Sequence, residues 1–232
     1  MCMIRPMQRQ FFCEMLQTYS AKEIVDRLAP FLLDRRRAKI DEVLVRRLGS
    51  IHVAVESPYD IHNALALVRS CEAFGLLNFH LIKPTLKKRA GRRTTMGTKN
   101  WVDIKVHETL DAFFSQGLPI AAAAPKGEVS LDDLDVTRPL CLLFGNEREG
   151  LSKEAMERSG TTYHIPMFGM AESLNISVAG AISLYEVAKK RRAHLKREGD
   201  LTADQLMQER AHAYVQTLGK EKSEKLLKSE KV

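Results

Sequence analysis

The sequence predicts an α/β domain with a largely parallel sheet, flanked by helical segments at both ends of the chain. Short apolar segments typical of buried strands alternate with helical patterns through the middle of the chain. The strand candidates are IHVAVE, LNFHLIK, VDIKVH, PIAAAA, PLCLLFG and YHIPM. Alternation of strands with helices favours a parallel sheet that is covered on both faces.

Helical patterns fill most of the intervals between these strands. One pattern runs from Asn63 to Phe74 and stops at Gly75, and another runs from Thr109 to Gln116 and stops at Gly117. In sheets of this kind, ligands bind beyond the carboxyl ends of the strands. The turn after IHVAVE has no glycine, so a dinucleotide site of the G-x-G-x-x-G type is not expected there.

The chain divides into three segments. Residues 1–49 are predicted to be a helical basic extension, residues 50–190 the α/β domain, and residues 191–232 a helical basic tail. In the tail, Thr202 and Gln205 form a capping-box pattern that opens a helix, while the last residues of the chain are expected to fray.

The charge balance favours an anionic partner. The chain has 36 Lys and Arg against 29 Asp and Glu, a net charge of +7. Nucleic acid is a better candidate than membrane because the chain has no long apolar segment, although a basic protein without such a partner stays an alternative. The candidate nucleic-acid-binding residues are Arg35, Arg36, Arg37, Arg46, Arg92, Arg93, Lys189 and Arg191.

The cysteines and the N-terminus favour the cytoplasm. The four cysteines lie far apart and lack C-x-x-C spacing, so neither a disulfide framework nor a zinc site is predicted. Charged Arg5, Arg9 and Glu14 occupy the place of a secretory apolar region, so no signal peptide is expected, while an organelle presequence stays an alternative. No metal cofactor is expected, because no cluster of His, Asp or Glu has ligand spacing.

Glycines and small polar residues gather in two loops that follow apolar strands. The segment LLFGNEREGLS contains Gly145 and Gly150, and IPMFGMAESLNISVAGA contains Gly169, Ser173 and Asn175. Each loop alone could be only a turn. Both loops should project from the same edge of the sheet, where glycine would let the backbone approach a ligand closely.

Together with HNALALVRSCEAFG and RRTTMGTKNWV, these motifs resemble the SPOUT-class RNA 2′-O-ribose methyltransferases, specifically tRNA guanosine methyltransferases of the TrmH (SpoU) type. The resemblance covers roughly residues 34–192. It implies a C-terminal deep trefoil knot, S-adenosylmethionine as methyl donor, and a homodimer that builds each active site from both chains. The implied acceptor is guanosine 18 in the D-loop of tRNA.

The resemblance also implies which residues bind the donor. The loops at Gly145, Gly169, Ser173 and Asn175 would fold around S-adenosylmethionine. Apolar side chains would line its purine, and these are Leu143, Ile165, Met167 and Leu174.

The acceptor side is implied to contain Arg69, Asn63 and Glu147. Family proposals make Arg69 a base, but a protonated guanidinium has no lone pair. Anchoring the phosphate and stabilising a developing alkoxide requires no such assumption. Asn63 could instead be a helix N-cap, and Glu147 either orients Arg69 or is a charge at a helix N-terminus.

Several alternatives stay open. The RNA could be ribosomal, or the chain could be an inactive RNA-binding relative or a nucleotide-binding regulator. An inactive relative would be expected to lack Arg69 or Asn175, and this chain has both. Tyr59 could stack on a base or simply close a turn. The histidines His52, His80, His107 and His164 follow strand patterns and are interpreted as packing residues.

Overall fold

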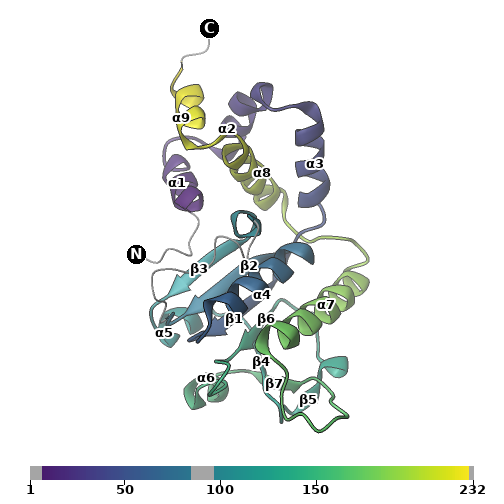
Figure 1. Cartoon of the computed structure of the whole chain (residues 1–232). Coiled ribbons are helices and arrows are strands. Elements are labelled where there is room, and N and C mark those ends of the chain that lie inside the picture. The colour runs from purple at the N-terminus through teal and green to yellow at the C-terminus, as the bar shows by residue number, and fades with distance from the viewer. Residues whose placement is uncertain (1–6, 85–96, 230–232) are drawn as a thin grey trace.

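The computed structural model describes residues 7–84 and 97–229 of the chain and is built on one seven-stranded sheet (Figure 1). The strand order is β3-β2-β1-β6-β4-β7-β5, and every pair of neighbours is parallel. The predicted fold class is therefore confirmed. The strands are β1 Leu48–Glu56, β2 Leu76–Ile82, β3 Asp103–His107, β4 Ile120–Ala123, β5 Val129–Ser130, β6 Leu140–Phe144 and β7 Thr161–His164.

The strand order reverses between β1 and β6. From β1 the chain builds outward through β2 to β3, and it later inserts β6 on the other side of β1, where Val55 pairs with Phe144. A reversal of this kind leaves a crevice beyond the carboxyl ends of the two strands. The loops that follow β1 and β6 therefore lie next to each other.

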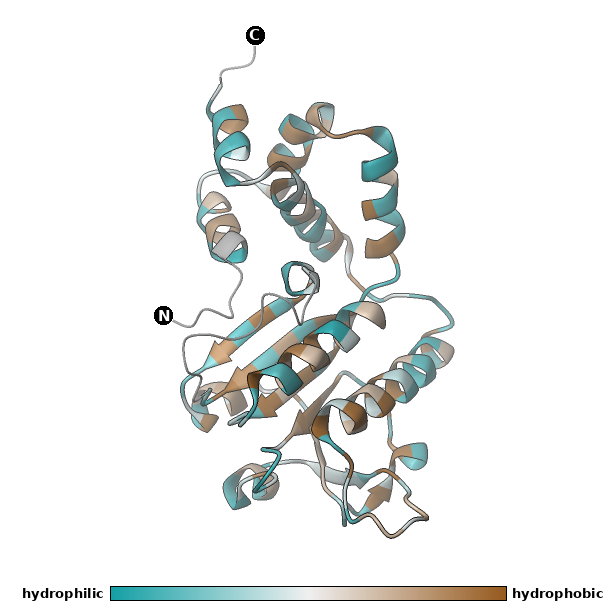
Figure 2. Cartoon of the chain, viewed as in Figure 1, coloured by the Kyte–Doolittle hydropathy of each residue, from teal (hydrophilic) through white to brown (hydrophobic). Residues whose placement is uncertain are grey.

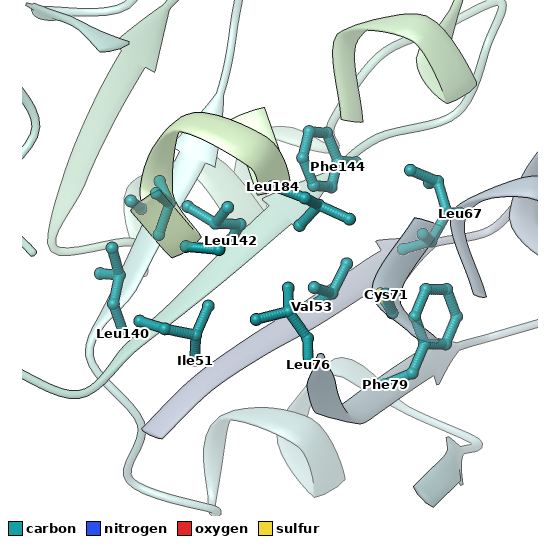
Figure 3. Packing of buried hydrophobic residues seen from close by; sticks show 14 of the residues in the cluster. Ile51, Val53, Leu67, Cys71, Leu76, Phe79, Leu140, Leu142, Phe144 and Leu184 are labelled. Carbon is teal, nitrogen blue, oxygen red and sulfur yellow. The ribbon is translucent and has the colours of Figure 1, made fainter. Parts of the chain in front are cut away.

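Two long helices cover one face of the sheet. They are α4 (Ile61–Ala73) and α7 (Ile176–Leu195), and their apolar side chains pack on those of β1, β2 and β6 (Figure 3). The helices approach closely, because a Cβ added at Gly180 would lie 2.0 Å from Leu67. The shorter helices α5 (Leu110–Phe114) and α6 (Lys153–Glu157) cover the opposite face, where they form a separate apolar cluster with strand residues such as Leu143. In the hydropathy view, the strands are among the most apolar segments (Figure 2).

Helices from both ends of the chain pack against one another beside the sheet (Figure 1). They are α1 Met7–Met15, α2 Ala21–Leu28, α3 Asp34–Leu44, α8 Ala203–Leu218 and α9 Lys220–Lys228. The two terminal segments thus share one apolar cluster. Fraying of the C-terminal segment is not seen over α9, because Leu227 is buried in that cluster. The Thr202–Gln205 capping box is confirmed.

A largely buried arginine, Arg9, joins helices α1 and α8 to the sheet. Arg9 on α1 makes two hydrogen bonds to Glu209 on α8, of 2.6 and 2.8 Å, and its Nε lies 3.4 Å from a carboxylate oxygen of Asp103 on β3. Because one partner alone would leave a charge buried and unpaired, the three residues act as a unit. This contact fixes α1 and α8 against the edge of the sheet.

Three histidines form a hydrogen-bonded row across β1, β2 and β3. His52 Nδ1 lies 3.0 Å from His80 Nε2, and His80 Nδ1 lies 2.9 Å from His107 Nε2. Burial, and then the neighbouring His52, lower the pKa of His80 to about 2. Burial and then Lys105 lower the pKa of His52 to about 4. The row is therefore neutral in the folded protein.

Acidification should destabilise the fold through this row. Below the unfolded histidine pKa of about 6.5 the unfolded chain binds protons that folded His80 does not, so the free energy of unfolding falls as pH decreases. At pH 5 the loss reaches up to about 2 kcal/mol for His80, while none is expected above pH 7. Urea unfolding at pH 5 and at pH 7 measures this loss in the free energy of unfolding. His80→Gln should show a smaller loss than the control His194→Gln, which changes an exposed histidine. Equal losses in both variants would contradict this account.

Candidate active site

The candidate site lies where the strand order reverses, at the loops that follow β1, β6 and β7. The first loop leaves β1 through Ser57, which has a positive φ of 44°. The carbonyl of Ser57 accepts a 2.7 Å hydrogen bond from Asn146 Nδ2 in the second loop. Asn146 was not among the expected site residues, although its place beside Gly145 and Glu147 was a usable signal.

Glu147 ties the first loop to the second. Its Oε2 accepts a 2.9 Å hydrogen bond from the backbone N–H of Tyr59, and its Oε1 accepts one of 3.1 Å from Asn63 Nδ2. No hydrogen bond or ion pair joins Glu147 to Arg69 in the described chain, so Glu147 orients Asn63 instead. The N-cap of α4 is Asp60, whose Oδ1 accepts from His62 N at 2.8 Å. Asn63 is therefore free of the capping role.

Asn175 adds the third loop to this junction. Its Oδ1 caps α7 by accepting from Ser177 N at 2.8 Å and from Ser177 Oγ at 2.6 Å. Its Nδ2 lies 3.4 Å from Asn63 Oδ1, a long hydrogen bond. Glu147, Asn63 and Asn175 thus form a chain of polar contacts that joins all three loops.

Arg69 lies on α4, outside this chain of contacts. It lies six positions after Asn63, about 1.7 helical turns, so the two side chains leave the helix in different directions. Arg69 is exposed and makes no hydrogen bond or ion pair with any described residue. Its full set of donors is available to a molecule that binds there.

The loop between β7 and α7 is held differently from the other two. In the described chain, no hydrogen bond of any kind involves residues 166–174. Phe168 and Met170 are almost fully exposed, at 98% and 102%. Exposed large apolar groups beside unpaired backbone groups are typical of a surface that something else covers.

Gly145 and Gly169 are glycine for different structural reasons. A Cβ at Gly145 would lie 2.2 Å from the backbone of Gly150, so the turn itself requires glycine there. At Gly169 an added Cβ would meet no atom within 4 Å, and φ is not in the left-handed region. Nothing in the described chain requires glycine at position 169, so it leaves room for the close approach of another molecule.

The other expected donor-binding residues are placed unequally. Ser173 is exposed, and Met167 and Leu174 are each 37% exposed at the loop. Ile165 is half-buried. Leu143 is fully buried in the cluster beneath α5 and α6, so it supports the loop from inside and does not line an open surface.

The basic residues of the first segment are mostly paired within the protein. Arg35 is exposed and has no hydrogen bond or ion pair in the described chain. The others have partners, which are Thr217 for Arg36, Asp34 for Arg37, and both Glu42 and Glu198 for Arg46.

Of the basic residues predicted at the C-terminal end of α7, Lys189 is exposed and Arg191 is buried. Lys189 is exposed and 2.8 Å from Glu186. Arg191 is 6% exposed, and its Nη1 donates to the carbonyls of Val136 and Thr137 at 3.0 and 2.7 Å. Arg191 therefore stabilises the domain, and we leave it out of the nucleic-acid surface. Arg92 and Arg93 lie outside the described residues.

Within residues 7–84 and 97–229, no helix is both long and apolar enough to cross a membrane. The same residues contain no group of three or more His, Cys, Asp or Glu side chains placed to hold a metal ion.

The chain belongs to the SpoU rRNA methylase family, whose model matches residues 50–185. It is 36% identical over 163 residues to the tRNA (guanosine(18)-2′-O)-methyltransferase of Thermus thermophilus, covering 68% of this chain and 84% of the relative. The family membership expected from the motifs is confirmed.

Solved structures of methyltransferases are similar to this chain over most of its length. The TrmH/SpoU tRNA modifying enzyme of Aquifex aeolicus superposes with a TM-score of 0.69 at 31% identity, covering 81% of this chain and 98% of that enzyme. An rRNA methyltransferase of Sinorhizobium meliloti with bound AdoMet gives a TM-score of 0.54 at 27% identity, covering 67% and 60%. The match to the first enzyme implies the knotted form of the fold.

Proposed function

We propose that this protein transfers a methyl group from S-adenosylmethionine to the ribose 2′-hydroxyl of guanosine 18 in tRNA. The Thermus relative carries this activity in its name, and it aligns with most of its own length. The observation in this chain that supports the proposal is the junction of Glu147, Asn63 and Asn175 beside a loop with unpaired backbone groups. Free thiols at Cys13, Cys71 and Cys141 suit a cytoplasmic location.

The donor would bind at the loop between β7 and α7. S-adenosylmethionine supplies an electrophilic methyl group on a sulfonium. Backbone C=O groups of residues 166–174 and N–H groups of residues 167–174 are free to bind its polar edges, and the open space at Gly169 admits it. Met167 and Leu174 offer apolar contact for the purine. Asn175 stays fixed by its bonds to Ser177, which holds the end of the loop in place.

The acceptor would meet Arg69 and Asn63. Arg69 binds the phosphate beside the acceptor ribose and stabilises the negative charge that develops on its 2′-oxygen. A guanidinium does not accept the hydroxyl proton, so as the new O–CH3 bond forms and the S–CH3 bond breaks, the proton passes to the adjacent substrate phosphate or to water. The side chain of Asn63, oriented by Glu147, positions the ribose.

We also propose a homodimer, for which α7 supplies the contact surface. Val178, Ile182 and Tyr185 are 47%, 40% and 55% exposed and follow helical spacing on one face. Phe168 and Met170, on the loop that precedes α7, are further exposed apolar side chains. A second copy would cover these groups and bring its own loop close to the site.

Methyl transfer should occur on tRNA and depend on the planar fork of Arg69. With labelled donor, mapping of the methylated ribose should give guanosine 18. Arg69→Ala should keep donor affinity in calorimetry and lose at least ~100-fold in turnover, because one group that stabilises the transition state is removed. Arg69→Lys should restore little, because lysine keeps the charge without the fork. Arg138→Ala, at another exposed arginine, is the control.

Two results would count against this assignment. Near-normal turnover in Arg69→Lys would show that charge alone is sufficient. Label found on ribosomal RNA and absent from tRNA would move the protein to the ribosomal branch of the family.

The dimer should depend on the apolar face of α7. Ile182→Glu should yield a monomer in light scattering at micromolar concentration and abolish methyl transfer, because a charge is then buried at the contact. The control Val45→Glu places the same charge at an apolar residue that is 54% exposed and does not belong to the apolar face of α7. A monomeric parent protein with full activity would refute the proposed dimer.

A further inference from the structure

Tyr59 presents an exposed aromatic ring at the mouth of the candidate site. The ring is 58% exposed, and the guanidinium carbon of Arg148 lies 3.7 Å from its centroid. Tyr59 belongs to the loop after β1, and Arg148 to the loop after β6. The pair therefore spans the crevice where the strand order reverses.

The backbones on both sides of the pair are fixed. Tyr59 N donates to Glu147 Oε2 at 2.9 Å, and Arg148 N donates to Asn146 Oδ1 at 2.8 Å. Asn146 also binds the first loop through Ser57. The turn is thus closed by side chains other than the phenol, whose hydroxyl makes no hydrogen bond within the described chain.

Other arginine–aromatic pairs in the described chain are built differently. Arg27 lies over Tyr19, Arg36 over Trp101 and Arg158 over Phe114. Each of those rings is partly buried against an apolar cluster. Tyr59 packs against none of the clusters, so its ring contributes little to the core and leaves aromatic surface open to solvent.

We propose that Tyr59, backed by Arg148, is a stacking platform for a nucleobase of the RNA substrate. This inference rests on the proposed function. Arg148 covers one face of the ring, and a base stacks on the other, as aromatic side chains commonly do with unstacked RNA bases. Glu147 binds both Tyr59 N and Asn63, so the platform lies beside the residues assigned to the acceptor ribose. The platform orients the nucleotide and takes no part in bond formation.

The aromatic ring of Tyr59, and not its hydroxyl or the charge of Arg148, should determine the catalytic efficiency on tRNA. Tyr59→Ala should lower kcat/KM for tRNA about 10-fold, mainly through KM, while Tyr59→Phe stays close to the parent. Donor affinity by calorimetry should be unchanged in both variants. Arg148→Ala should give a smaller loss than Tyr59→Ala, and Arg158→Ala, which removes an arginine from the ring of Phe114, should give none.

Salt dependence separates stacking from phosphate binding. Tyr59→Ala should weaken tRNA binding and leave the slope of log Kd against log salt unchanged, because no counterion-releasing contact is lost. A flattened slope, a phenylalanine variant as weak as the alanine variant, or reduced donor affinity would each overturn the platform. If the parent protein binds tRNA but transfers no methyl group, the proposed function fails. In that case, tRNA binding by these variants still decides whether Tyr59 stacks.

Discussion

One carboxylate, that of Glu147, holds together the two loops on which the site is built. The reversal of strand order places the ends of β1 and β6 side by side, but it does not fix the loops that follow. Glu147 does so by accepting from a backbone amide and from the side-chain amide of Asn63, and Asn146 adds a bond to Ser57. Hydrogen bonds to a charged acceptor contribute about 1.5–3 kcal/mol each, enough to fix loops that otherwise have few contacts.

The third loop complements this rigid pair. Asn175 joins its end to Asn63, but residues 166–174 before it are unbonded. If residues 166–174 bind the donor as we propose, donor binding, and not folding, orders the last part of the site. Ordering on binding costs affinity, and burial of Met167 and Leu174 against the donor would offset that cost.

Local patterns in the sequence were sufficient for every strand except β5, for α4 and α5, and for the loops that carry the site, because apolar runs and glycine stops report local structure. The side-chain interactions of individual residues were not predictable from the sequence. Arg191 and Arg35 look alike in a basic run, yet only Arg191 is buried, because burial depends on segments distant in the chain. Strand β5 is too short to give a pattern, and α9 is ordered by contacts with the other terminus.

Two loops of the site are fixed by hydrogen bonds, those after β1 and β6, and the loop after β7 is not. Amide hydrogen exchange, with and without S-adenosylmethionine, tests this difference most directly. In the free protein, the amides of Tyr59, Arg148 and Gly150 should be protected, since each donates a hydrogen bond, while those of residues 167–174 should exchange almost without protection. Saturating donor should slow exchange across residues 167–174 at least ~10-fold and change the other amides little. Protection of that loop before donor is added, or no change after it, would contradict the account.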